Sequence, residues 1–210
     1  MCCRYYMEMS PELRPIVEEM NRAPLAAKMR DKLGKALTTS GEVRPTNIAP
    51  TIASSPSGVR KVYPMLWGFT AKGVDLPIVN CRVETAATKP LWKDAWKSHR
   101  CIVPASWYFE WEHLLTPSGK SKTGDKYMIQ PRGAEVMYMA GLYRLEEFRD
   151  LKYPVFTILT REPSAELASL HDRMPLLLPS ELVDAWIKPD AEPEELVKAA
   201  LTDMVFEKAG

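Results

Sequence analysis

The second residue of the chain carries its most distinctive chemistry. The sequence begins Met-Cys-Cys-Arg, and removal of Met1, which a small second side chain favours, would leave Cys2 with its amine and thiol on adjacent carbons. An aldehyde can condense with that amine to a Schiff base, and the thiol can then close a five-membered thiazolidine. Reference pKa values near ~8 for an α-amine and ~8.5 for a thiol keep both nucleophiles accessible around neutral pH. Cys2 is therefore a candidate nucleophile, the alternative being an ordinary frayed terminal residue.

Five short segments place polar or reactive residues where the flanking pattern predicts strand ends or loops. They read MCCR at 1–4, NIAPT at 47–51, NCRVET at 80–85, WYFEW at 107–111 and LHDRMP at 170–175. With Trp67-Gly68, this ordered set resembles the SOS response-associated peptidase (SRAP) family over Cys2 to about Ile187. Two positions depart from the family pattern, because Cys3 stands where glycine is usual and Thr46 where an aromatic residue is usual.

The resemblance implies a DNA damage response protein that captures abasic sites in single-stranded DNA. Members of the family link covalently to such sites through the amino-terminal cysteine, which shields the lesion, and slow reversal or lyase activity is also implied. An abasic deoxyribose in its open form presents an aldehyde, which is the electrophile that the chemistry of Cys2 requires independently. The expected partner is therefore single-stranded DNA that contains an abasic site.

Glu110 and His171 are the candidate groups for proton transfer. Glu110 lies among four aromatic residues, and a carboxylate desolvated by such neighbours has a raised pKa. His171 lies in an expected loop, where a near-neutral pKa would allow proton transfer during sugar opening or Schiff-base formation. The alternatives are a solvent-facing glutamate on an alternating strand and a histidine that only stabilises structure, the role we expect for His99 and His113.

Four further residues are expected to hold the DNA. Asn80 can hold a sugar oxygen through its amide, and this makes it the fourth candidate catalytic residue; a turn or cap role is the alternative. Arg82, on the same strand face, can grip a phosphate with its two-pronged guanidinium. Arg4 is a natural phosphate ligand beside a captured sugar, and Trp67 could stack on a base, although a core role fits it equally well.

Two other functions remain open from these residues. One is a cysteine peptidase, at least for autoproteolytic removal of Met1, with Cys2 as nucleophile, His171 as base and Glu110 as orienting group. The other is a non-catalytic module that binds single-stranded DNA through Arg4, Arg82 and Trp67.

Composition sets the remaining expectations. A net charge of +1 over 210 residues gives no overall basic field, so DNA binding requires charges sorted onto one face. The sequence has no signal-peptide pattern or membrane-length apolar run, so we expect a cytoplasmic monomer that associates with the nucleoid when engaged with DNA. The four cysteines lack metal-ligand spacing, so no metal and no cofactor is expected, and Cys81 and Cys101 fit buried apolar positions.

Hydrophobic periodicity and turn residues predict the elements that position these groups. Helices are expected after Ser10, from Pro24 to Leu33, and over 88–97, 181–187 and the tail after Pro189, which ends in an apolar run at 204–206. Strands are expected over 61–69, 101–111, 136–143, 155–160 and 173–178, an irregular path over 45–50, and a polar loop over 116–125. Strand runs with inserted helices indicate an α+β fold. We expect a single domain over residues 2–210, with a strongly curved, barrel-like, mostly antiparallel sheet and flanking helices.

Overall fold

A closed β-barrel forms the centre of the molecule. The computed structural model describes residues 3–115 and 121–209. The strands of the larger sheet run in the order β13-β12-β4-β3-β8-β11-β14, and β11 also pairs with β12, which closes five of them into a barrel. These five are β3 (Ile48–Ser54), β4 (Arg60–Trp67), β8 (Arg100–Ala105), β11 (Met137–Phe148) and β12 (Leu151–Arg161). The β12–β4 pair is parallel, whereas the other barrel pairs are antiparallel.

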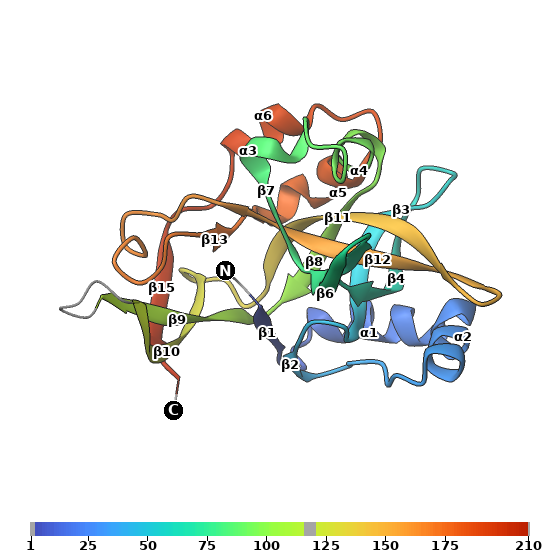
Figure 1. Cartoon of the computed structure of the whole chain (residues 1–210), viewed down its shortest axis with the longest axis horizontal. Coiled ribbons are helices and arrows are strands. Elements are labelled where there is room, and N and C mark those ends of the chain that lie inside the picture. The colour runs from blue at the N-terminus through green and yellow to red at the C-terminus, as the bar shows by residue number, and fades with distance from the viewer. Residues whose placement is uncertain (1–2, 116–120, 210) are drawn as a thin grey trace.

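A second, five-stranded sheet extends to the left of the barrel in Figure 1, in the order β15-β10-β9-β1-β2. Its members are β1 (Arg4–Met7), β2 (Gly41–Val43), β9 (Trp107–Leu115), β10 (Ser121–Pro131) and β15 (Met204–Lys208). The short strands β5 (Phe69–Ala71) and β6 (Val74–Ile78) pair with each other. Strand β7 (Asn80–Arg82) joins β12, which also pairs with β13 (Met174–Pro175), while β14 (Leu177–Leu178) pairs with β11.

Two groups of helices flank the barrel on opposite sides in Figure 1. On one side lie α1 (Leu13–Arg22) and α2 (Pro24–Leu33). On the other lie α3 (Val83–Ala86), α4 (Lys93–Ser98), η1 (Ser180–Leu182), α5 (Val183–Ile187) and α6 (Pro193–Lys198). Helix α1 buries Leu13, Ile16, Val17 and Met20, whose spacing puts them on one face. No helix in the described parts of the chain is long and apolar enough to cross a bilayer.

The expected architecture is confirmed: the protein is α+β, with a curved, barrel-forming, mostly antiparallel sheet and flanking helices. The expectation of one strand over 101–111 is wrong, because the chain leaves the barrel at Ser106 and continues as β9 in the second sheet. Ser106 fixes this passage, since its amide donates to the Tyr6 carbonyl at 2.8 Å and its hydroxyl accepts from the Glu8 amide at 2.9 Å.

Other element boundaries also differ from expectation. Helix α4 begins at Lys93 rather than near residue 88, since Pro90 interrupts the segment. Strand β3 begins at Ile48, inside the segment expected to be irregular, and pairs Pro50 with Pro64, two residues that lack an amide donor. Helix α2, by contrast, has the expected bounds, and Gly34 caps its C-terminus in the left-handed conformation at φ 63°. The apolar run at 204–206 forms part of strand β15 on β10.

The Trp67-Gly68 pair belongs to the core. Trp67 is fully buried, its Nε1 donates to the Val79 carbonyl at 3.0 Å, and its ring stacks on Phe156 at a centroid distance of 5.9 Å. Gly68 adopts φ 121°, and a Cβ there would come within 2.5 Å of the Cβ of Pro77. The expectation that Trp67 stacks on a DNA base is therefore corrected, because no ring surface is accessible to a base.

Candidate functional site

Glu110 and His171 meet in the interior, brought together by strand β9 and the turn before β13. Both side chains are almost fully buried, and Glu110 Oε1 lies 3.5 Å from His171 Nε2. The His113 amide donates to the Leu170 carbonyl at 3.1 Å, which ties β9 to the turn that carries His171. The sequence prediction that these two distant residues act together is thus supported by direct contact between them.

The protonation of His171 follows from its surroundings. The Arg173 amide is buried and donates to Nδ1 at 3.0 Å. The Asp172 carboxylate lies 2.9 Å from the same nitrogen, but its side chain is 71% exposed and is solvated by water. If Nδ1 carried the proton, the buried Arg173 amide would lose its acceptor, which costs more than leaving the exposed Asp172 carboxylate to water. We therefore assign a lone pair to Nδ1 and the proton to Nε2, which faces Glu110.

Burial shifts both members of the pair toward their neutral forms. It raises the pKa of Glu110, as the sequence predicted from its aromatic neighbours. It lowers the pKa of His171 to about 4, and the nearby His113 adds to this effect. The expected near-neutral pKa of His171 is therefore wrong: the imidazole is neutral at physiological pH and presents its Nε2 proton to Glu110, while Glu110 is poised to hold or release a proton.

Cys3 lies beside this pair. It is half-buried, and burial raises the pKa of its thiol, with the charge of Glu110 acting in the same direction. The Cys3 thiol is therefore protonated near neutral pH and is a weak competitor for an electrophile. Cys2, the predicted nucleophile and the preceding residue of the chain, lies outside the described residues.

Asn80 and Arg82 lie two residues apart on β7, opposite Ile158 and Thr160 of β12. Asn80 is half-buried and Arg82 is exposed, so the alternation of the strand puts both on one face as expected.

An ion pair ties the Asn80–Arg82 strand to the segment that carries His171. Arg173 donates to both oxygens of Glu84, at 2.9 and 2.8 Å, and also to the Thr160 carbonyl at 2.7 Å. Because Thr160 faces Arg82 in the sheet, Arg173 joins the His171 segment to β7.

Arg4 lies on the other face of the second sheet from Glu110. Its Nη1 donates to Glu42 Oε1 at 3.0 Å, and its guanidinium lies 5.2 Å from the centre of the Trp111 ring. The side chain is 35% exposed, and an incoming phosphate would compete with Glu42 for it. Its predicted role in DNA binding stays a prediction.

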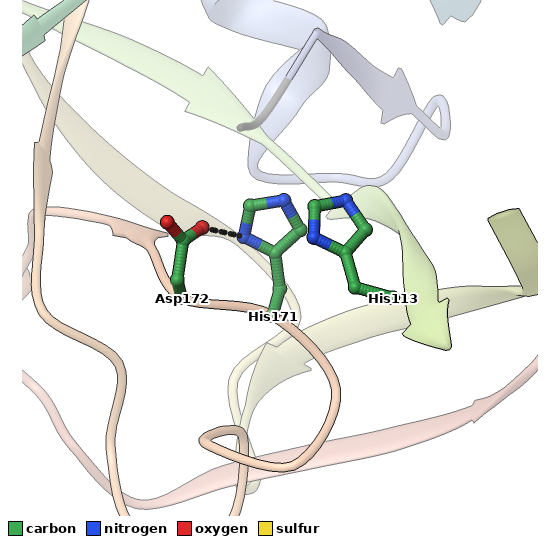
Figure 2. A group of neighbouring side chains, drawn as sticks. All are labelled: His113, His171 and Asp172. Atoms are coloured by element: carbon green, nitrogen blue, oxygen red, sulfur yellow. Dashed lines mark ion pairs between the residues drawn. The ribbon is translucent and has the colours of Figure 1, made fainter. Parts of the chain in front are cut away.

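One cluster in the described part of the chain could hold a metal ion. Figure 2 shows the His171 ring between Asp172 and His113, and the three side chains offer ligand atoms within 4.8 Å of one another. Metal coordination through Nδ1 of His171 would, however, remove the acceptor of the Arg173 amide. The donor set is thus better explained as support for a neutral imidazole, and the expected lack of a metal site stays a prediction.

Sequence reasoning missed two residues of the site. His113 was expected to be structural, yet its ring lies 4.1 Å from that of His171, centroid to centroid. Strand alternation assigns residues 110 and 113 to opposite faces, so the sequence spacing gave no signal for this proximity. Arg173 was part of the LHDRMP segment but received no role, and its ion pair with Glu84, 89 residues earlier in the chain, requires tertiary structure to find.

Cys81 and Cys101 are buried, as expected, and have no part in the site. Burial raises the pKa of Cys81 to about 12 and also raises that of Cys101, so both thiols are inert near neutral pH. Cys3, Cys81 and Cys101 are free thiols.

The fold and the site define a β-barrel protein with a buried glutamate–histidine pair beside the first described residues of the chain. The family model "SOS response associated peptidase (SRAP)" matches residues 1–208, and the chain belongs to this family.

Two relatives and one solved structure illustrate the similarity. The chain is 35% identical over 171 residues to abasic site processing protein YMR114C of Saccharomyces cerevisiae, a match covering 75% of this chain but only 44% of the yeast protein. It is 31% identical over 171 residues to abasic site processing protein YobE of Bacillus subtilis, covering 74% of each. A protein from Bacteroides thetaiotaomicron shares the fold, with a TM-score of 0.73 at 20% identity over all of this chain and 92% of that one.

Proposed function

We propose that this protein captures abasic sites in single-stranded DNA as a covalent thiazolidine on Cys2, after removal of Met1, and so shields the lesion. The carrying observation is the buried contact between Glu110 and His171 beside Cys3, the residue that follows the nucleophile. Membership of the SRAP family and the printed names of the relatives, abasic site processing proteins, support the same substrate.

The proposed reaction needs protons moved at three points. Opening of the sugar hemiacetal breaks the ring C1–O bond and requires a proton for the departing oxygen, leaving an aldehyde at C1. The free amine of Cys2 adds to that aldehyde, and loss of water from the carbinolamine gives the Schiff base. The Cys2 thiol then adds to the same carbon and its proton passes to the nitrogen, so that aminothiol plus aldehyde give thiazolidine plus one water.

The two buried side chains supply these transfers in complementary forms. Protonated Glu110, favoured by its raised pKa, donates to the departing ring oxygen and regains a proton from the C1 hydroxyl; it then donates to the leaving water and regains a proton from the Cys2 nitrogen. Neutral His171 holds its Nε2 proton toward Glu110, so the carboxylate formed after each donation is stabilised by an adjacent donor. Burial of both groups strengthens these interactions, because water does not screen them.

The strand that carries Asn80 and Arg82 would position the DNA. Its link through Glu84 and Arg173 to the His171 segment supports a shared site for sugar and phosphate. Asn80 would hold a sugar oxygen, while exposed Arg82 and Arg4 would bind the flanking phosphates. Autoproteolytic removal of Met1 by the same glutamate and histidine is a second candidate activity, favoured by the peptidase in the family's description.

A denaturing gel tests the proposal. The mature protein is incubated with a single-stranded oligonucleotide carrying one abasic site, and the expected product is a protein–DNA band that survives heat and denaturant. Cys2→Ala should abolish the band, whereas the matched variant Cys3→Ala should retain it, because the Cys3 thiol is not the nucleophile. Non-covalent binding without this band would support a plain DNA-binding module, and cleavage of unrelated peptides would support a peptidase.

A further inference from the structure

The face of the second sheet that points away from Glu110 is lined by alternating aromatic and cationic side chains. Strand alternation puts Trp107, Phe109 and Trp111 of β9 on this face, and Glu110 on the other. The strand register pairs them with Tyr6, Arg4 and Lys126 respectively. We call these six residues the cation–aromatic face.

Contacts within the cation–aromatic face form a continuous row. Tyr6 and Trp107 stack with a centroid distance of 4.6 Å and an angle of 5° between their planes. Phe109 meets Tyr6 edge-on at 6.5 Å, and the Lys126 ammonium lies 3.6 Å from the centre of its ring. Lys126 and Arg4 then lie 5.6 and 5.2 Å from the centre of the Trp111 ring. All except Phe109 keep part of their surface accessible to solvent.

A single carboxylate gathers the cations at one end of this row. Glu42 accepts from Arg4 Nη1 at 3.0 Å, from Arg44 Nε at 2.7 Å and from Lys126 Nζ at 3.4 Å. Partial burial acts to raise the pKa of Glu42, but the three cations outweigh it and lower that pKa, so the group is charged. Three cations converging on one anion form a point that a phosphate could share or take over.

We propose that the cation–aromatic face is a second binding surface for the DNA strand that flanks the captured lesion. Arg4, Arg44 and Lys126 hold a backbone phosphate in place of Glu42, and a base extends the Tyr6–Trp107 stack. Strand β1 begins at Arg4, directly after Cys3 at the reaction site, so the Arg4 end of this face lies one residue along the chain from that site. Single-stranded DNA suits the surface because cations match its phosphates and aromatic rings stack on unpaired bases of any sequence.

The surface has a defined end beyond Trp107. Glu8 and Glu135 line a hollow there together with Trp107, Met128 and Gln130. Two carboxylates repel a phosphate backbone, so the bound strand leaves the sheet at this point. The cation–aromatic face therefore accommodates only the nucleotides nearest to the lesion.

Oligonucleotide length provides the test, which rests on the proposed function. Covalent capture is followed with abasic oligonucleotides of about 5 and about 15 nucleotides, a range that spans known single-strand site sizes. For each, the DNA concentration giving half-maximal capture rate is measured, and the ratio of the two values is the length-dependent gain. The variants are Tyr6→Leu, which keeps an apolar side chain but removes the ring, Lys126→Gln and Glu42→Gln. Lys152→Gln, an exposed change on β12, is the matched control.

The proposal predicts a different result for each variant. Tyr6→Leu lowers the gain about fivefold, which is the lower end of the range expected for the loss of one base–aromatic stack. Lys126→Gln lowers the gain and reduces the salt slope of binding by about 0.7, as for one lost phosphate contact. Glu42→Gln raises the gain, because the competing anion is removed.

Two outcomes overturn the proposal while leaving the proposed function intact. One is a wild-type protein that captures both oligonucleotides with equal half-maximal concentrations. The other is a gain that Tyr6→Leu and Lys126→Gln leave at the level of Lys152→Gln. A wild-type protein that captures neither oligonucleotide would instead contradict the proposed function itself.

Discussion

Acidification should destabilise this protein through His171 in a way that one substitution removes. The folded-state pKa of about 4 lies below the ordinary value of 6.5, so between these two values the unfolded chain binds more protons than the folded one. Stability therefore rises with pH across that window and falls on acidification. For one such group, going from pH 7 to pH 5 lowers the free energy of unfolding by about 2 kcal/mol.

Urea unfolding at the two pH values measures this effect. His171→Gln removes the titrating group and keeps an amide donor that can face Glu110, so its loss of stability between pH 7 and pH 5 should be smaller by about 2 kcal/mol. The raised pKa of Glu110 acts in the opposite direction but is common to both proteins, so the difference between them isolates His171. His99→Gln, a change at an exposed histidine, is the control and should behave like wild type. Equal pH dependence in wild type and His171→Gln would refute the assignment of a buried, neutral imidazole.

Three further predictions follow from the same geometry. Glu110→Gln should slow covalent capture by about 100-fold or more, the usual contribution of a positioned acid, while the affinity for intact single-stranded DNA in a fluorescence anisotropy assay stays unchanged. Equal capture rates would remove Glu110 from the mechanism. Trp67→Ala should lower the free energy of unfolding by about 3–5 kcal/mol in urea titrations, because it empties a buried site. Trp67→Phe should bind DNA like wild type. Weaker DNA binding by a stable Trp67→Phe protein would instead support the predicted stacking of Trp67 on a base. Dialysis against a metal chelator should leave the capture rate unchanged, and lost activity that zinc restores would establish a metal at His113, His171 and Asp172.

The sequence predicted the class of fold well because strand and helix patterns are local. The spacing of Leu13, Ile16 and Val17 requires a helix wherever its partner surface lies. The change of sheet at Ser106 was not visible, because residues 101–111 are rich in aromatic and β-branched residues on both sides of that serine. Long-range hydrogen bonds from Ser106 to the segment around Tyr6 divide that stretch, and no local pattern encodes them.

The candidate site was predictable only in part for a similar reason. The reactive residue types and their flanking aromatics indicated Glu110 and the direction of its pKa shift. The depth of His171 and its contact with His113 depend on a turn packed against β9, which sequence spacing does not reveal. Trp67 had two reasonable roles from its residue type, and only its full burial decided between them.

Mass spectrometry of the captured product identifies the residue and the atoms that hold the abasic site. The protein is reacted with a single-stranded oligonucleotide carrying one abasic site, digested with nuclease and protease, and the amino-terminal peptide is fragmented. The expected product is a peptide that begins at Cys2, lacks Met1 and carries the sugar remnant, with one water lost, on the Cys2 amine and thiol. A retained Met1, or a remnant on Cys3 or any other residue, would contradict capture by Cys2.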